Sequence, residues 1–186
     1  SVSHLRPVQL EDLLSRDPVR VDLMEIAGYL GGKTVLVTGA GGSIGSELCR
    51  QVAAVGPRKL VLLGHGENSI HNIWLELKDK FPELNLAIEI ADVRDKPRVD
   101  LVFQMHRPEV VFHAAAHKHV PLMELHPAEA VKTNIFGTRN LAQAAGRYGT
   151  KRFLLISTDK AVNPSSVMGA TKRFAELIIT RENMVS

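Results

Sequence analysis

The chain has 186 residues, and its 23 basic and 20 acidic side chains leave a formal net charge of +3. This length suits one domain with a buried core, and so small a charge argues against a nucleic-acid-binding surface. Cys49 is the only cysteine, which excludes an internal disulfide and favours a reducing compartment. Because the sequence shows neither a bilayer-spanning apolar run nor a signal peptide, we expect a soluble, cytoplasmic protein.

The first 32 residues differ in pattern from the rest of the chain. They contain two short amphipathic pieces, at 9–14 and 22–30, which are separated by Pro18 and end at Gly31-Gly32. We expect residues 1–32 to form a helical arm that packs on the domain or on a partner subunit, or a linker from a segment upstream.

From residue 33 onward, short apolar runs alternate with amphipathic helical patterns. The expected strands are Thr34–Thr38, Lys59–Leu63, Leu86–Ile90, Val110–His113 and Arg152–Ser157. The first expected helix begins near Ser43, and the later ones cover Glu67–Lys80, Lys96–His106, Pro127–Tyr148 and about Val167–Asn183. This alternation predicts that residues 33–186 form an α/β domain with a Rossmann-like doubly wound parallel sheet. Since no strand follows the last helix, we expect the sheet to be truncated there and a substrate lobe to be absent.

A glycine-rich turn follows the first expected strand. Its candidate binding residues are Gly39, Gly42, Ser43, Ile44 and Gly45. Glycine tolerates positive φ and lets a diphosphate approach the backbone, while the helix N-terminus behind it offers free N–H groups. Three spaced glycines alone fit an ordinary turn, but the strand before them and the helix after them favour a dinucleotide site.

The second expected strand runs into Gly64-His65-Gly66-Glu67, with no Asp at its tip for the adenosine ribose. His65 or the backbone would face the ribose instead. No arginine clearly seats a 2′-phosphate, so the choice between NAD and NADP stays open, with NAD favoured.

The third and fourth strands also end in candidate cofactor residues. Asp92 can accept a hydrogen bond from the adenine amino group while Val93 covers the ring, and Asp95 suits the N-cap of the next helix. Ala114 and Ala115 leave space for a flat ring or a ribose against the backbone.

Two further residues are candidates for the substrate side. Lys118 can reach a substrate phosphate, although a solvated loop lysine is the plain alternative. Asn134, inside an apolar helix, is expected to bond backbone across the core next to the site. The neighbouring histidines superficially suggest a metal, but no Cys, Asp or Glu lies nearby at ligand spacing, so we predict none.

The segment after the fifth strand is the richest in chemistry. Thr158, Asp159 and Lys160 place a hydroxyl, a carboxylate and an amine at the ligand edge of the sheet, a plausible acid–base set. Lys172 shares a face of the last helix with Met168. A capped loop with a surface ion pair is the alternative.

These motifs resemble a known family. T-G-A-G-G-S-I-G resembles the turn of extended short-chain dehydrogenase/reductases. D-V-R-D, H-A-A-A-H-K-H-V-P-L-M-E and S-T-D-K-A-V-N-P-S-S-V-M-G-A-T-K-R resemble the polysaccharide-biosynthesis branch that dehydrates UDP-sugars at the 4,6-positions, and the likeness runs from about Leu5 to the C-terminus. It implies an NAD(P)-dependent UDP-N-acetylhexosamine 4,6-dehydratase, with hydride removed from carbon four of the sugar and returned to carbon six. It also implies a homo-oligomer and a membrane-anchored parent on the inner face of the cell membrane.

The resemblance also implies roles for individual residues. Thr158 would contact the reacting oxygen, Asp159 would protonate the leaving 6-hydroxyl, and Lys160 would be the base alpha to the new ketone, which requires a lowered pKa. Lys172 would hold the nicotinamide ribose. Met168 stands where the superfamily has a catalytic Tyr, and a thioether cannot accept that proton, although the branch includes members with this Met.

Two alternatives stay open. One is a nucleotide-sugar epimerase or reductase, against which the Asp159-Lys160 pair argues because epimerisation needs no base at carbon five. The other is a non-catalytic NAD(P)-binding module. Without a sugar-binding lobe, we expect the chain by itself to be inactive.

Overall fold

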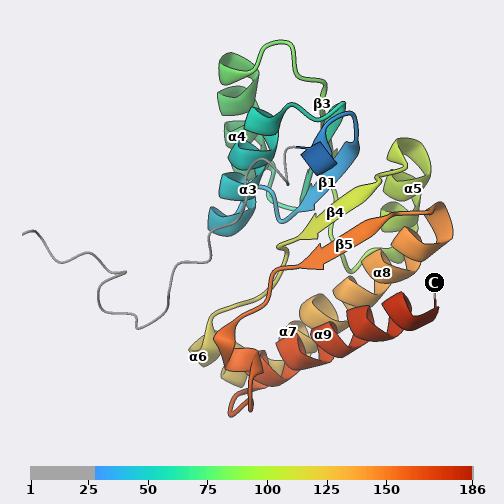
Figure 1. The fold of residues 1–186 in the computed structure, drawn as a ribbon. Helices are drawn as coiled ribbons and strands as arrows, with labels where there is room; N and C mark the ends of the chain where they lie inside the picture. Colours follow the sequence, from blue (N-terminus) through green and yellow to red (C-terminus); the bar gives the residue numbers. More distant parts are fainter. Residues whose placement is uncertain (1–27, 186) are drawn as a thin grey trace, which may run out of the picture.

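A computed structural model describes residues 28–185 and shows one parallel sheet covered by helices (Figure 1). The five strands are β1 (Thr34–Thr38), β2 (Lys59–Gly64), β3 (Leu86–Ile90), β4 (Val110–His113) and β5 (Arg152–Leu155). They lie in the order β3-β2-β1-β4-β5, and every neighbouring pair is parallel. This confirms the predicted doubly wound sheet, with its strand order reversing between β1 and β4.

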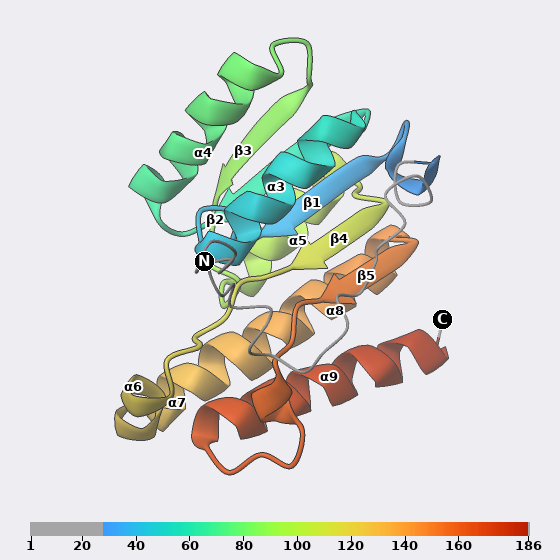
Figure 2. The ribbon, with the colours of Figure 1, turned by 60° about the vertical axis from the view of Figure 1, so that its left-hand side comes forward.

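Four helices cover the two faces of the sheet: α3 (Ser43–Val55), α4 (Glu67–Lys80), α5 (Lys96–His106) and α8 (Thr138–Tyr148). The remaining helical elements are α6 (Val120–Leu125), α7 (Pro127–Ala130), the π-helix η1 (Val131–Gly137), the 3₁₀ helix η2 (Asp159–Ala161) and α9 (Val167–Val185). In both ribbon views α6, α7 and the start of α9 lie beyond the arrowheads of β4 and β5 (Figures 1 and 2). These elements therefore extend the ligand edge of the sheet.

The core has two layers because successive strand residues point to opposite faces. Val35 and Val37 pack with α3 and α4, whereas Leu36 packs with Phe103 of α5 and Leu141 of α8. All five of these side chains are fully buried. Near-continuous apolar strands of this kind are typical of a parallel sheet covered on both faces.

The segment before β1 is only partly described. Residues 1–27, where most of the expected arm falls, lie outside the described residues. Leu30 is buried in the core beside Tyr29, and Gly31 forms an antiparallel bridge with Pro57. Residues 29–31 thus pack against the sheet domain. Within the described part, no helix combines the length and apolar character needed to cross a membrane.

The structure differs from the predicted elements in three places. The long helix expected at 127–148 is helical throughout, but 131–137 is a π-helix. Helix α6 was not predicted, because six residues are too few to show a helical period. Strand β5 ends at Leu155 rather than Ser157, since the carbonyl of Ile156 accepts from the Lys172 side chain.

The glycine turn has the shape that its sequence predicts. Gly39 adopts a φ of +65°, and a Cβ there would lie 2.7 Å from the backbone nitrogen of Ala115. A Cβ on Gly45 would lie 2.0 Å from the carbonyl oxygen of Gly39. The turn, the end of β4 and the first turn of α3 can therefore meet only because these two positions lack side chains.

Replacing Gly45 with Ala should lower the free energy of unfolding by about 1–3 kcal/mol, because the new methyl group overlaps backbone that cannot move aside. Gly146→Ala is the matched control: Gly146 lies in α8 with nothing within 4 Å of its Cβ position. That change should stabilise the helix by about 0.5–1 kcal/mol. Urea unfolding measures both, and equal stability of the two variants would contradict the packing described here.

Candidate functional site: a pocket and a reactive edge

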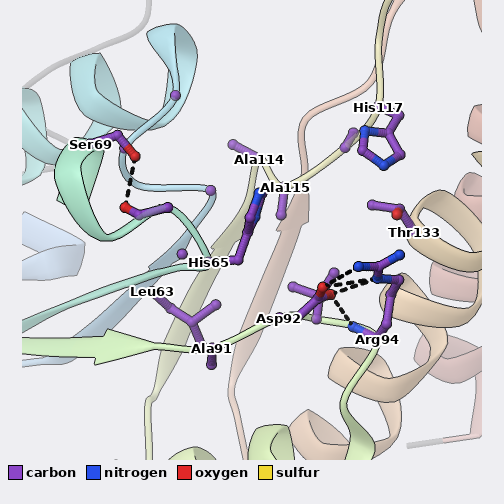
Figure 3. Close-up of a pocket in the computed structure, with 17 residues that line it drawn as sticks. Leu63, His65, Ser69, Ala91, Asp92, Arg94, Ala114, Ala115, His117 and Thr133 are labelled. Carbon is purple, nitrogen blue, oxygen red and sulfur yellow. Dashed lines mark hydrogen bonds and ion pairs between the residues drawn. The ribbon is translucent and has the colours of Figure 1, made fainter. Parts of the chain in front are cut away.

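A pocket of about 270 Å³ opens at the carboxyl edge of the sheet, where the strand order reverses (Figure 3). Its walls are the segments that follow β1, β2, β3 and β4. Seven of the predicted cofactor residues line it: Gly39, Gly42, His65, Asp92, Val93, Ala114 and Ala115. The fold thus brings together residues that are up to 76 positions apart in the sequence.

Two helices begin at this pocket without side-chain caps. The N-cap residues are Gly42 for α3 and Gly66 for α4, and neither has a side chain to bond the first N–H groups. Ser43 and Ile44 are exposed at the start of α3, and Gly45 is buried beneath the turn. Uncapped N–H groups with the positive end of the helix dipole suit a diphosphate.

Asp92 lines the pocket but is already paired. Arg94 donates from Nε to both carboxylate oxygens, at 3.0 and 2.9 Å, and from Nη2 to one of them at 2.6 Å. Its third nitrogen, Nη1, donates to Glu129 at 2.9 Å. The Arg94 guanidinium holds the pKa of Asp92 below its usual range. Figure 3 shows this pair beside Thr133 and His117. Asp95 is the N-cap of α5, as predicted, and accepts from the backbone N–H of Arg98.

One end of the pocket lies between β2 and the start of α4. His65 projects into it, and Ser69 donates to the carbonyl of Gly66 at 2.9 Å (Figure 3). Sequence reasoning missed both Ser69 and Arg94 as lining residues. Ser69 carries a sequence signal only in its place one turn into α4, and the role of Arg94 depends on its pairing in three dimensions.

A chain of buried hydrogen bonds lies behind the pocket. His113 bonds the hydroxyl of Thr38 through Nδ1 at 2.7 Å and that of Thr138 through Nε2 at 2.9 Å. Thr138 in turn donates to the carbonyl of Asn134 at 2.7 Å. Burial lowers the pKa of His113 to about 3, so the ring is neutral at physiological pH.

Asn134 bonds backbone across the core, as expected. Its Oδ1 accepts from the N–H of His117 at 2.9 Å, and its Nδ2 donates to the carbonyl of His117 and to Thr171. With both amide hydrogens used and only 1% of its surface exposed, Asn134 is unsuited to contact a sugar directly. Its role is to hold the backbone of His117 next to the pocket. Lys118 is exposed and lies next to the pocket-lining His117.

The predicted reactive residues follow β5 and do not line the pocket. The Thr158 hydroxyl donates to Asp159 at 3.0 Å, and Thr158 caps the 3₁₀ helix η2. Asp159 and Lys160 are exposed. They lie at the same carboxyl edge as the pocket because β4 and β5 are adjacent parallel strands.

Lys172 reaches this edge from α9. Its Nζ donates to the carbonyl of Ile156 at 2.6 Å, and 6% of the residue is exposed. Burial lowers the pKa of the Lys172 amine to about 8, while the Glu176 carboxylate opposes that shift. Glu176 was not singled out in the sequence, yet it accepts from the Ser157 hydroxyl at 2.6 Å.

Met168 is buried in a small apolar cluster with Met123 of α6 and Ala130 of α7. The cluster holds the first turn of α9, and Glu124 of α6 strengthens it by accepting from the N–H of Val167 at 2.7 Å. Met168 therefore packs where the resemblance expects a tyrosine. Glu124 was also missed, since only the folded chain brings it to α9.

Cys49 of α3 is buried and serves packing. Burial raises the pKa of Cys49 to about 12, which makes its thiol a poor nucleophile. Among residues 28–185, no three His, Cys, Asp or Glu side chains gather in a way that could hold a metal ion.

A parallel sheet in this order, with a glycine turn at its switch point, defines a Rossmann-type fold. The chain belongs to the polysaccharide biosynthesis protein family, whose model matches residues 35–186. It is 57% identical to the probable polysaccharide biosynthesis protein EpsC of Bacillus subtilis, over all of this chain and 31% of that protein. It is 35% identical to a UDP-N-acetylglucosamine 4,6-dehydratase (inverting) of Campylobacter jejuni, over 83% of this chain and 45% of that one.

Other relatives and solved structures have the same fold. A UDP-glucose 4-epimerase of Rickettsia rickettsii is 33% identical over 83% of this chain and 45% of its own length. The X-ray structure of Pen from Bacillus thuringiensis superposes with a TM-score of 0.75, at 33% identity, over 84% of this chain and 46% of that one. The DesIV double mutant, a dTDP-glucose 4,6-dehydratase from Streptomyces venezuelae with NAD and DAU bound, has a TM-score of 0.67 at 25% identity, over 77% and 49%. The chain thus spans about a third to a half of the length of these proteins.

Lowering the pH from 7 to 5 should lower the free energy of unfolding by about 2 kcal/mol through His113 alone. The folded state holds this ring neutral down to about pH 3, whereas the unfolded chain takes up a proton near the ordinary value of 6.5. Stability is therefore present above pH 6.5 and is lost as the pH falls below it. His117, whose pKa is lowered mainly by burial, adds a loss of the same sign.

Urea unfolding across this pH range checks the prediction. His113→Gln should be less stable than the wild type at pH 7 but should show a shallower loss toward pH 5. His71→Gln, at an exposed position of α4, is the control and should keep the wild-type slope. An unchanged slope in His113→Gln would refute the assignment to His113.

Proposed function

We propose that this chain is the cofactor-binding part of a nucleotide-sugar 4,6-dehydratase that converts a UDP-N-acetylhexosamine to its 4-keto-6-deoxy product in polysaccharide biosynthesis. The observation that carries the proposal is the placement of Thr158, Asp159 and Lys160 at the carboxyl end of β5. The named 4,6-dehydratase relative and the family of the chain support it. Residues 33–186 would form the nucleotide-binding domain, and residues 1–32 the linker that leads into it.

The pocket fits a nicotinamide dinucleotide. Gly39 and Gly42 line the pocket next to the uncapped start of α3. A Cβ on Gly41 would lie 2.3 Å from Ser69 Oγ, so the turn can lie this close to α4 only without a side chain there. Asp92 and Val93 would meet the adenine, His65 the ribose, and Ala114 and Ala115 the flat face of the ligand. When bound, the nicotinamide supplies a temporary acceptor for the hydride of carbon four. NAD is favoured over NADP, and the NAD-bound neighbour supports that choice.

The residues after β5 would carry the proton transfers. Thr158 would bond the reacting 4-oxygen, Asp159 would protonate the leaving 6-hydroxyl, and Lys160 would remove the proton at carbon five. Lys172 would bond the nicotinamide ribose, and Lys118 a phosphate of the UDP-sugar. Met168 offers no proton acceptor, so the proton of the 4-hydroxyl would pass to Thr158, Asp159 or a water.

An epimerase is the second candidate, and the epimerase relative favours it. Against it stands the Asp159-Lys160 pair, because an epimerase moves hydride at carbon four only and needs no acid and base at carbons five and six. A non-catalytic NAD(P)-binding module is the third candidate. It would use the same pocket, so only a product assay separates it from the dehydratase.

The protein would also assemble as a homo-oligomer. Exposed Phe136 of η1 and exposed Phe174 and Leu177 of α9 offer an apolar surface on helices that flank the reactive edge. Such a surface supports a homo-oligomer that forms through these helices. The parent protein would lie on the cytoplasmic side, attached to the inner face of the cell membrane.

The chain should bind NAD, with an affinity several-fold higher than for NADP, in isothermal calorimetry at pH 7. Asp92→Asn should weaken NAD binding about tenfold, because the substituted side chain loses the carboxylate that faces the adenine and anchors Arg94. Asp79→Asn, at an exposed position near the end of α4, is the control. Tighter binding of NADP would reverse the cofactor assignment, and binding of neither would remove the site.

In the full-length protein, Lys160→Ala should lower the turnover of UDP-N-acetylglucosamine at least about a hundredfold while NAD binding stays normal, because the base at carbon five is lost. Lys151→Ala, at the exposed residue before β5, is the matched control and should keep wild-type turnover. Mass spectrometry of the 4-keto-6-deoxy product measures the rate. Unchanged turnover in Lys160→Ala would sink the dehydratase mechanism.

A further inference from the structure

One face of α9 is fastened to the segment that links β5 to the reactive residues. Gly169, Lys172 and Glu176 lie at spacings of three and four residues, so they share that face. A Cβ on Gly169 would lie 2.3 Å from the carbonyl oxygen of Lys160, so the helix backbone contacts η2 directly. The helix thus follows the segment from its reactive end back to the end of β5.

Two hydrogen bonds complete this attachment. The amine of Lys172 donates to the carbonyl of Ile156, and the hydroxyl of Ser157 donates to Oε1 of Glu176, each at 2.6 Å. The two bonded residues of the segment are consecutive and directly precede Thr158. Any rotation of α9 would therefore move Ile156 and Ser157, and with them the Thr158–Lys160 segment that follows. Loss of either hydrogen bond would detach this segment from α9 at that point.

Glu176 is also the acidic group that acts on Lys172. Its carboxylate is the charge that raises the pKa of the Lys172 amine against the effect of burial. Arg173 donates to its second oxygen at 2.8 Å, and this bond and the Ser157 bond lower the pKa of Glu176, so it is ionised at neutral pH. His113, which is neutral, lies within electrostatic reach of Lys172. The elements packed on α9 carry further titratable or charged groups: Glu124 of α6, Glu129 of α7, Lys132 of η1, Arg139, Arg147 and Tyr148 of α8, Arg152 of β5, and Asp159 and Lys160 of η2.

We infer that Glu176 is a positioning residue that fixes the Ser157–Lys160 segment against α9 and places its carboxylate one helical turn from Lys172. The inference rests on the proposed function in one respect only: in that function Lys172 would hold the nicotinamide ribose. Glu176 does not line the pocket. It acts on Lys172 by its charge and on Ser157 by a hydrogen bond, and two substitutions can separate these effects.

Glu176→Gln removes the charge but keeps an oxygen that can accept from Ser157. Ser157→Ala removes the hydrogen bond but keeps the carboxylate. Titration of the Lys172 side chain by carbon-13 NMR, assigned with Lys172→Arg, reads the charge directly. We expect the titration midpoint in Glu176→Gln to move at least about half a pH unit lower, and that in Ser157→Ala to stay at the wild-type value.

The pH profile of turnover in the full-length protein is the second measurement. Its alkaline limb should move to lower pH in Glu176→Gln by the same amount, whereas Ser157→Ala should lower kcat across the whole range without moving the limb. An unchanged Lys172 midpoint in Glu176→Gln, or an equal shift in both variants, would overturn the inference. A wild-type protein with no turnover would defeat the proposed dehydratase but would leave the NMR result standing, so the two failures are distinguishable.

Discussion

A continuous run of buried hydrogen bonds joins the central strands of the sheet to the helix that carries Lys172. It passes from Thr38 in β1 through His113 in β4 to Thr138, and through Asn134 to Thr171 in α9. Bonds of this kind strengthen in a low-dielectric interior, where each unpaired group would cost the free energy of its lost hydration. The network therefore joins β1 and β4, whose ends border the pocket, to the helix that carries Lys172.

The π-helical turn η1 explains how one helix can serve both ends of that network. Widening the helix at 131–137 lets Asn134 face the backbone of His117, while Gly137 lies against Val93, whose Cγ2 is 2.6 Å from a Cβ placed on that glycine. One turn later, Asn140 donates to the carbonyl of Val93 at 3.1 Å. The same stretch thus positions both the loop after β3 and the loop after β4. Single π-turns are rare and occur mostly at functional sites.

Much of this fold follows from local pattern. The bounds of β1, β3, β4, α4 and α5 agree with those predicted, because apolar runs and caps such as Asp95 act within a few residues. The pocket was predictable for a similar reason, since the ends of parallel strands must share an edge. The hydrogen-bond partners of individual side chains were not predictable in this way. Arg94 meets Glu129 and Ser157 meets Glu176 across 35 and 19 residues, and only the packing of helices on the sheet brings them together.

Burial, rather than sequence motif, separates the two lysines of the reactive edge. A lysine can act as a base only as a neutral amine, and removal of water is a main way to favour that form. Lys172 is buried, and its lowered pKa follows from that burial, whereas Lys160 is exposed in the described chain. For Lys160 to accept a proton from a sugar, the bound substrate or further chain would have to cover it. The relatives are two to three times longer than this chain. Within the described chain, burial thus distinguishes Lys172 from the exposed Lys160.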